Sequence, residues 1–248
     1  RRGCIEGRFA EPPLHMILSH KHRFIFLKTA KTGGTSTELA LSPVCGPDDI
    51  LAPLSRPEER KRKESPARNY ALGIGKLGIR LPGEFRHHFP QVYGYYNHMP
   101  AGQVRRLAGE DVWRDYFKFT IERNPWDRQV SFYFWRTRHS KPQPDFRTFL
   151  MSPRHRGKAF RSARMKNWLT YTIDDRIAVD RVIRYEDLED GLATVCAELG
   201  IAEPVSLPGA KGHTRKDVRH YRDFYDDETR DLIATWYARE IEAFGYTF

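Results

Sequence analysis

Residues 28–36, which read KTAKTGGTS, have two lysines ahead of a glycine pair and two hydroxyl side chains directly after it. Gly33 and Gly34 permit close approach of the backbone to a ligand, and Thr35 and Ser36 add hydroxyl groups. A helix beginning here would direct its first amides and the positive end of its dipole at that ligand. The segment predicts a site for a doubly charged anion. The plainer alternative is a capped helix after a glycine turn.

This loop does not match the loop that binds ATP in kinases. That loop reads G-x-x-x-x-G-K-[ST], and aligning its lysine with Lys31 puts Ile25 and Ala30 where glycines are required. A second glycine motif, G-x-G-x-x-G at residues 73–78, follows no convincing strand and precedes no helix, so we interpret it as a chance match. Neither segment predicts a triphosphate site.

A second group of polar residues lies at 123–131, which read RNPWDRQVS. Arg123 directly follows an alternating apolar run, and Ser131 comes one turn into the helix expected from Asp127. A guanidinium offers paired donors and a serine a hydroxyl, a combination that suits a monophosphate. The alternative is a turn and helix cap at Asn124 to Asp127, with Arg128 as a solvated charge.

The elements that must position these residues alternate between strand and helix. Strands are expected at 24–27, 116–121 and 182–183. Helices are expected at 35–41 and 100–108, from 127 onward, at 188–199 and at 232–244, the last from one apolar stripe. Residues 46–92 and 141–166 are rich in Pro, Gly and charge and are expected to be irregular surface. The pattern predicts a single α/β domain with a central parallel sheet flanked by helices and with ligands at the carboxyl ends of its strands.

Together the two clusters carry a family resemblance. Residues 24–36 resemble the 5′-phosphosulfate loop of sulfotransferases, and residues 123–133 resemble their 3′-phosphate motif, RNPxDRxxSxY. Residues 184–188, which read RYEDL, and the closing segment 221–248 are also similar to the family. The likeness is greatest to the carbohydrate-type branch: heparan, dermatan and chondroitin sulfotransferases and their bacterial relatives. The family usually has proline where this chain has Ala30, and Lys28 is an additional lysine.

The resemblance implies a P-loop-like fold and transfer of a sulfuryl group from 3′-phosphoadenosine 5′-phosphosulfate (PAPS) to a hydroxyl or amine, without a metal. Lys31 would stabilise negative charge on the oxygen that bridges sulfur and the 5′-phosphate. The remaining donor-binding residues implied by the family are Thr32, Gly33, Gly34, Thr35 and Ser36 for the 5′-phosphate, Arg123 and Ser131 for the 3′-phosphate, and Lys211 and Arg215 in a basic loop over the nucleotide.

A general base must accept the proton of the acceptor, and His98 is the first candidate. It directly precedes a helix begun by proline, and an imidazole titrates near neutral pH. His87, His88 and Glu38 are alternatives. His20 and His22 have no further ligands at a spacing that suits a metal.

Composition limits the partners and the setting. A net charge of +10 favours anionic partners, and a carbohydrate or other anionic acceptor is expected. A small-molecule kinase and a basic nucleic-acid-binding protein are the alternatives, although neither has its motif.

Three cysteines without metal spacing and no long apolar run favour a reducing, cytoplasmic setting, while a removed leader stays open. Residues 5–8 read like an engineered protease site, so residues 1–14 are set apart as a tail and 15–248 as the domain.

Overall fold

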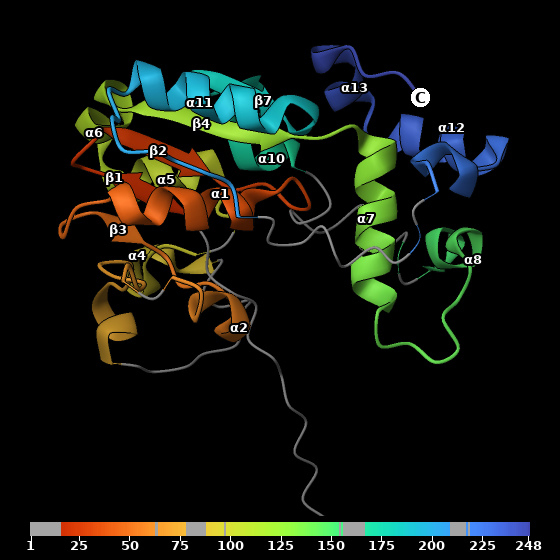
Figure 1. Ribbon diagram of the computed structural model, residues 1–248, viewed down its shortest axis with the longest axis horizontal. Helices are drawn as coiled ribbons and strands as arrows, with labels where there is room; N and C mark the ends of the chain where they lie inside the picture. Colours follow the sequence, from red (N-terminus) through yellow and green to blue (C-terminus); the bar gives the residue numbers. More distant parts are fainter. Residues whose placement is uncertain are drawn as a thin grey trace, which may run out of the picture.

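The computed structural model describes residues 16–62, 64–77, 88–96, 98–153, 155, 167–208, 217 and 219–248. The strands of its main sheet are β1 (Ile17–Ser19), β2 (Phe24–Leu27), β3 (Ile50–Leu51), β4 (Phe117–Glu122) and β7 (Arg181–Arg184). Their order is β3-β1-β2-β4-β7 (Figure 1). Strands β5 (Thr172–Ile173) and β6 (Arg176–Ile177) form a separate hairpin.

The three strands expected from the sequence are the parallel part of the sheet. β2 pairs in parallel with β4, Leu27 opposite Thr120, and β4 pairs in parallel with β7, Glu122 opposite Arg184. All three strands therefore end at the same edge, and the loops that follow β2 and β4 are neighbours. The α/β class with a central sheet flanked by helices is confirmed.

The sheet is mixed rather than wholly parallel, because it contains two further strands, β1 and β3, that the sequence did not predict. β1 runs antiparallel to β2, and β3 antiparallel to β1. β1 has only three residues, which are too few to show a strand period. The chain from β1 to β2 does show a hairpin pattern, in which a polar turn separates two apolar runs. Residues 46–92 are consequently not all surface, since Leu51, Ala52 and Leu54 are buried.

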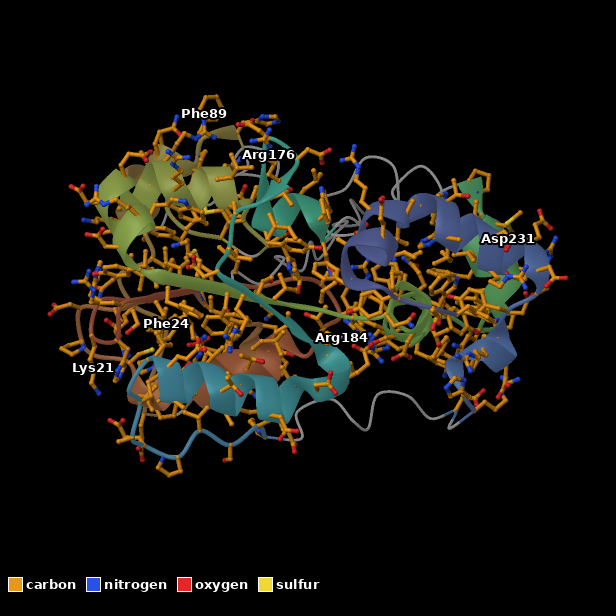
Figure 2. The ribbon with its side chains drawn as sticks, turned by 90° about the horizontal axis from the view of Figure 1, so that it is seen from above. Lys21, Phe24, Phe89, Arg176, Arg184 and Asp231 are labelled. Carbon is orange, nitrogen blue, oxygen red and sulfur yellow. The ribbon has the colours of Figure 1, made fainter. Side chains whose placement is uncertain are left out.

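Helices cover both faces of the sheet (Figure 2). On one face, α1 (Gly34–Leu41) and α11 (Leu188–Glu198) pack on a cluster that includes Phe24, Phe26 and Phe119. On the other face, α5 (Ala101–Ala108), α6 (Glu110–Asp115) and α10 (Trp168–Tyr171) pack on Ile25 and Leu27. A strand buried on both faces has no polar side, so β2 is a continuous apolar run.

A third apolar cluster lies beyond the sheet, among α7 (Pro125–Thr137), α8 (Phe146–Met151), α12 (Asp227–Trp236) and α13 (Ala238–Phe244). Figure 1 shows α7 continuing from the end of β4 into this unit. The single last helix predicted at 232–244 was wrong: Tyr237 has φ −120° and ψ 28°, which divides it into α12 and α13. Part of 141–166 is helix α8, with Phe146 and Leu150 buried.

Short elements complete the described chain. They are η1 (Ser42–Val44), α2 (Arg56–Glu59), η2 (Gly73–Leu77), α4 (Pro90–Tyr93), η3 (Tyr185–Asp187) and η4 (Tyr221–Phe224). Within the described residues, no helix is both long and apolar enough to cross a membrane. The tail set apart at 1–14 lies outside the described residues.

The start of α1 is packed tightly enough to require glycine. A methyl group on Gly34 would lie 2.6 Å from Cγ of Lys28, whose side chain is buried beneath the helix. We expect Gly34→Ala to lower the free energy of unfolding by about 1–3 kcal/mol, the usual cost of overpacking. Urea denaturation measures this.

Gly102 is the matched control, because a methyl group there would meet Ile173 at an ordinary 3.8 Å. Gly102→Ala in α5 should be neutral or stabilising by up to about 1 kcal/mol. Equal effects of the two substitutions would show that the packing around Lys28 is not the constraint.

Candidate active site

The loop after β2 has a strained backbone. Lys31 adopts φ 65° and Gly33 φ 78°, both in the left-handed region. For a residue with a side chain this conformation costs about 1–2 kcal/mol, so other contacts must maintain it. Some come from the threonines: the Thr29 hydroxyl donates to the carbonyl of Ile121 on β4 and lies 2.8 Å from the Thr32 hydroxyl.

The start of α1 has the features of an anion site. Gly33 precedes the helix without a side-chain cap, and the first turn carries no acidic residue. Lys31, Gly33 and Ser36 are half-buried, whereas Thr32 and Thr35 are buried. The Thr35 hydroxyl accepts a hydrogen bond from Nζ of Lys28 at 2.9 Å. Of the hydroxyl side chains of Thr32, Thr35 and Ser36, that of Ser36 is therefore the least buried.

Lys28, the additional lysine, supports the loop from within. Its Nζ lies 2.8 Å from Oε2 of Glu38, and both side chains are almost fully buried. The charge of Glu38 is thus matched by an ammonium beneath α1.

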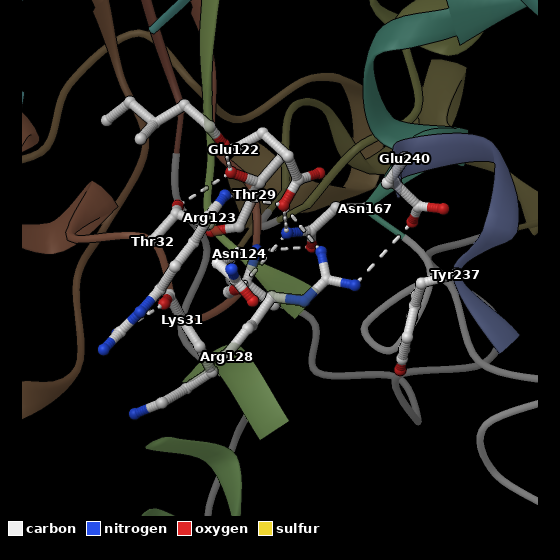
Figure 3. Close-up of polar contacts among 12 residues, drawn as sticks. Thr29, Lys31, Thr32, Glu122, Arg123, Asn124, Arg128, Asn167, Tyr237 and Glu240 are labelled. Carbon is white, nitrogen blue, oxygen red and sulfur yellow. Dashed lines mark hydrogen bonds and ion pairs between the residues drawn. The ribbon is translucent and has the colours of Figure 1, made fainter. Parts of the chain in front are cut away.

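Arg123 connects the two strand-end loops. Its Nη1 donates to the backbone carbonyl of Lys31 at 3.2 Å, while Nε and Nη2 donate to Oδ2 of Asp127 at 2.8 and 2.6 Å. Figure 3 shows Lys31 and Arg123 together on one side of the cluster around Glu122. The loop after β2 and the loop after β4 are therefore in direct contact at Lys31 and Arg123.

One face of α7 lines this site. Asp127, Ser131 and Trp135 are spaced by four residues and so lie along the same side of the helix. Asp127 holds the Arg123 guanidinium, and Nζ of Lys31 lies 5.8 Å from the centre of the Trp135 ring. The half-buried Ser131 lies between these two contacts along the helix.

Tyr185, from the RYEDL segment, packs against both loops. Its ring lies 4.1 Å from Cζ of Arg123, and a methyl group on Gly33 would lie 3.2 Å from its Cε2. The next residue, Glu186, accepts the backbone N–H of Asn124 at 2.9 Å. The sequence pattern included Tyr185 without a role. In the structure its ring packs against the Arg123 guanidinium.

His98 lies at the end of β2. Its Nδ1 is 2.9 Å from the backbone carbonyl of Lys28, and its own backbone has φ 53°. A carbonyl can only accept, so Nδ1 carries the hydrogen and Nε2 is the basic nitrogen of the neutral ring. Among the other histidines, His88 is exposed, and His20 and His22 lie in the turn that precedes β2, at the opposite end of the strand.

Beneath the site is a buried cluster centred on Glu122. Oε1 of Glu122 accepts from Nη1 of Arg128 at 2.7 Å, from Nδ2 of Asn167 at 3.1 Å and from the backbone N–H of Arg123 at 2.9 Å. Its Oε2 accepts from the Tyr171 hydroxyl at 3.1 Å. Arg128 is therefore not a solvated charge but a buried partner of β4.

Charges in this cluster alter the pKa values of its members. Burial alone would lower the pKa of Arg128, but the Glu122 carboxylate holds it above its ordinary value. Glu240, on α13, has a raised pKa because it is buried, and the Arg128 guanidinium only partly offsets this. Nη2 of Arg128 lies 3.7 Å from Oε1 of Glu240, too far for a hydrogen bond.

Some predicted residues cannot be placed. Lys211, Arg215 and His87 lie outside the described residues. In the part of the chain that is described, no group of three or more His, Cys, Asp and Glu side chains is arranged to hold a metal ion. The sequence reasoning missed Asn167, whose only signal was a single amide side chain, and it gave Tyr185 no role within the RYEDL motif.

The fold and site define an α/β protein with two cationic loops at adjacent strand ends. The model of the sulfotransferase family matches residues 14–247, and the chain belongs to that family. Its reaction is therefore a sulfotransfer, and the recognition made from the two motifs is confirmed.

Two known proteins are similar to this chain. An uncharacterized protein from Archaeoglobus fulgidus is 28% identical over 110 residues, which are 44% of this chain and 88% of that protein. A sulfotransferase from Alicyclobacillus acidocaldarius, known from a crystal structure, has 20% sequence identity and a TM-score of 0.44, over 89% of this chain and 92% of that one.

The raised pKa of Glu240 has a consequence for stability. When the folded-state pKa of a carboxyl lies above its unfolded value, the folded protein binds more protons, and stability falls as pH rises through that interval. The ordinary value is near 4.5. We expect Glu240→Gln to match the wild type in melting temperature near pH 4.5 and to exceed it increasingly as pH rises.

Thermal denaturation across this range measures the effect, with Glu242→Gln as the control, because Glu242 is exposed on the same helix. A Glu240→Gln variant that loses stability as pH rises would show instead that the carboxylate is needed to compensate Arg128.

Proposed function

We propose that the sulfuryl donor is PAPS and that it is bound across the two loops. The proposal depends on one observation: the Arg123 guanidinium donates to the Lys31 carbonyl, so the two cationic loops share one site. A donor with phosphates at its 5′ and 3′ positions needs two anion subsites a nucleoside apart. The start of α1 with Ser36 supplies the first, and Arg123 with Ser131 the second.

The chemistry of the residues in the two loops suits PAPS. A glycine-paired helix start without acidic neighbours suits a 5′-phosphate, because backbone amides donate without a side chain in the way. Arg123 is held on one side by Asp127 and stacked on Tyr185, which fixes the plane of its guanidinium before any ligand arrives. A planar, fixed guanidinium is suited to a phosphate at low entropic cost.

PAPS supplies an activated sulfuryl group, whose bond to the bridging oxygen breaks while the acceptor oxygen or nitrogen bonds to sulfur. Lys31 stabilises the electron pair that the bridging oxygen retains. This favours the transition state over the ground state, because the charge develops there. His98 accepts the proton of the acceptor at Nε2, with Nδ1–H held by the Lys28 carbonyl in the required tautomer.

For the acceptor we propose a carbohydrate or another anionic molecule. Trp135 supports it, because the centre of its half-buried ring lies 5.8 Å from Nζ of Lys31 and 5.1 Å from Cζ of the exposed Arg138. An aromatic ring flanked by cations suits a sugar face that bears acidic groups. The net charge of +10 would attract such an acceptor over a distance.

The experiment that tests the proposal is transfer from labelled PAPS to a panel of polysaccharides, glycolipids and phenols, without added metal. In this assay we expect His98→Ala to lower turnover at least about a hundredfold, the contribution typical of a general base. Affinity for adenosine 3′,5′-bisphosphate, measured by calorimetry, should change little, because His98 acts on the acceptor.

His88→Ala is the control, since His88 is exposed and was the weaker candidate. Turnover close to that of the wild type in the His98 variant would reject His98 as the base. Loss of turnover in the His88 variant alone would transfer the role to His88.

A further inference from the structure

Asn167 holds both backbone polar groups of Ala30, the residue that precedes Lys31. The Ala30 N–H donates to Oδ1 of Asn167 at 2.8 Å, and Nδ2 of Asn167 lies 3.2 Å from the Ala30 carbonyl. The side chain is fully buried, and 137 positions separate the two residues in sequence. An amide group enclosed in this way and paired with a distant backbone segment fixes the position of that segment.

The orientation of the carboxamide is determined by its partners. The Ala30 N–H can only donate, so it requires the amide oxygen, and the Ala30 carbonyl requires the amide nitrogen. Oε1 of Glu122 accepts from the same nitrogen at 3.1 Å. Glu122 therefore orients Asn167 (Figure 3). Asn167 in turn holds Ala30.

These contacts determine the backbone conformation of Lys31. The angles φ and ψ of a residue relate the peptide plane before it to the plane after it. The plane before Lys31 includes the Ala30 carbonyl, which Asn167 holds, and the plane after it includes the Lys31 carbonyl, which Arg123 holds. The left-handed φ of 65° is thus set from both sides by residues connected to Glu122.

We propose that Asn167 is a positioning residue for sulfuryl transfer: it keeps Lys31 in the left-handed conformation that directs its ammonium at the reacting group. This inference rests on the proposed function only in assigning Lys31 to the transferred sulfuryl group. Asn167 acts through Lys31 and does not touch the donor. Its loss should therefore affect the rate of transfer more than the affinity for the nucleotide.

The test uses Asn167→Leu and Asn167→Ser in the full chain, with PAPS as donor and the best acceptor from the panel. Leu has a similar size without hydrogen bonds, and Ser leaves room for water if the Leu variant does not fold. We expect kcat to fall about 10- to 100-fold, the scale of a misplacement of about 1 Å. The dissociation constant for adenosine 3′,5′-bisphosphate should stay within roughly threefold, because Arg123 and the α1 amides remain.

A double-mutant cycle distinguishes a purely structural role of Asn167 from an effect that Asn167 exerts through Lys31. Lys31→Arg keeps a cation, and hence a measurable rate, but its guanidinium does not reproduce the position of the ammonium. If Asn167 acts through Lys31, its substitution in the Lys31→Arg background should cost less than about threefold in kcat, because the two effects are not additive.

The same two substitutions at Asn69 are the control. Its side chain also holds backbone carbonyls, those of Pro47 and Asp49, but in the segment next to β3. They should lower stability and leave kcat unchanged. Unchanged kcat in the folded Asn167 variants, or an equal loss in both Lys31 backgrounds, would overturn the inference. A wild-type chain that neither turns over PAPS nor binds the bisphosphate would instead overturn the proposed function.

Discussion

A single buried carboxylate at the end of β4 connects the parts of this site. Glu122 is fully buried, and its two oxygens accept hydrogen bonds from Arg128, Asn167, Tyr171 and the backbone of Arg123. A buried carboxylate is stable only while hydrogen bonds satisfy the lone pairs of its oxygens. Glu122 therefore keeps each of these donors in place. Through Asn167 it fixes the loop after β2, and through Arg128 it fixes the start of α7.

Parallel pairing of β2, β4 and β7 brings the loops that follow these strands close to Glu122. Because β2, β4 and β7 end at one edge, residues distant in sequence meet there: Lys31 after β2, Arg123 after β4 and Tyr185 after β7. Two of the residues to which we assign chemistry, Lys31 and His98, have positive φ. Left-handed backbone at a side-chain-bearing residue is unfavourable in isolation and is maintained by surrounding contacts. Here those contacts come from Arg123, Asn167 and the His98 ring itself.

Much of this arrangement could be predicted from the sequence, for definite reasons. The run Phe24–Leu27 is apolar throughout because helices cover both sides of β2, and this indicated a parallel strand. Once the strands were parallel, the loops at Lys31 and Arg123 had to be neighbours. β1 and β3 were missed because strands of three and two residues show no period. The break at Tyr237 was missed because the apolar stripe continues across it.

Other contacts gave no signal in the sequence. Asn167 is one amide in a basic stretch without periodicity, and nothing local associates it with Ala30. The sequence left a solvated surface charge open as an alternative for Arg128, because its partners, Glu122 and Glu240, come from different elements. Burial of charge in this way depends on tertiary contacts, which a helix pattern does not contain. Thr35 has a hydroxyl at the expected helix start, but its partner is the buried ammonium of Lys28.

The claim that one nucleotide spans both loops is tested most directly by calorimetric titration of the wild-type chain, without metal, with adenosine 3′,5′-bisphosphate, adenosine 5′-phosphate and adenosine 3′-phosphate. A site with two phosphate subsites should bind one bisphosphate about 10- to 100-fold more tightly than either monophosphate, since each phosphate gains charge-assisted hydrogen bonds of about 1.5–3 kcal/mol. A bisphosphate bound no more tightly than the better monophosphate, or two nucleotides bound per chain, would contradict the account.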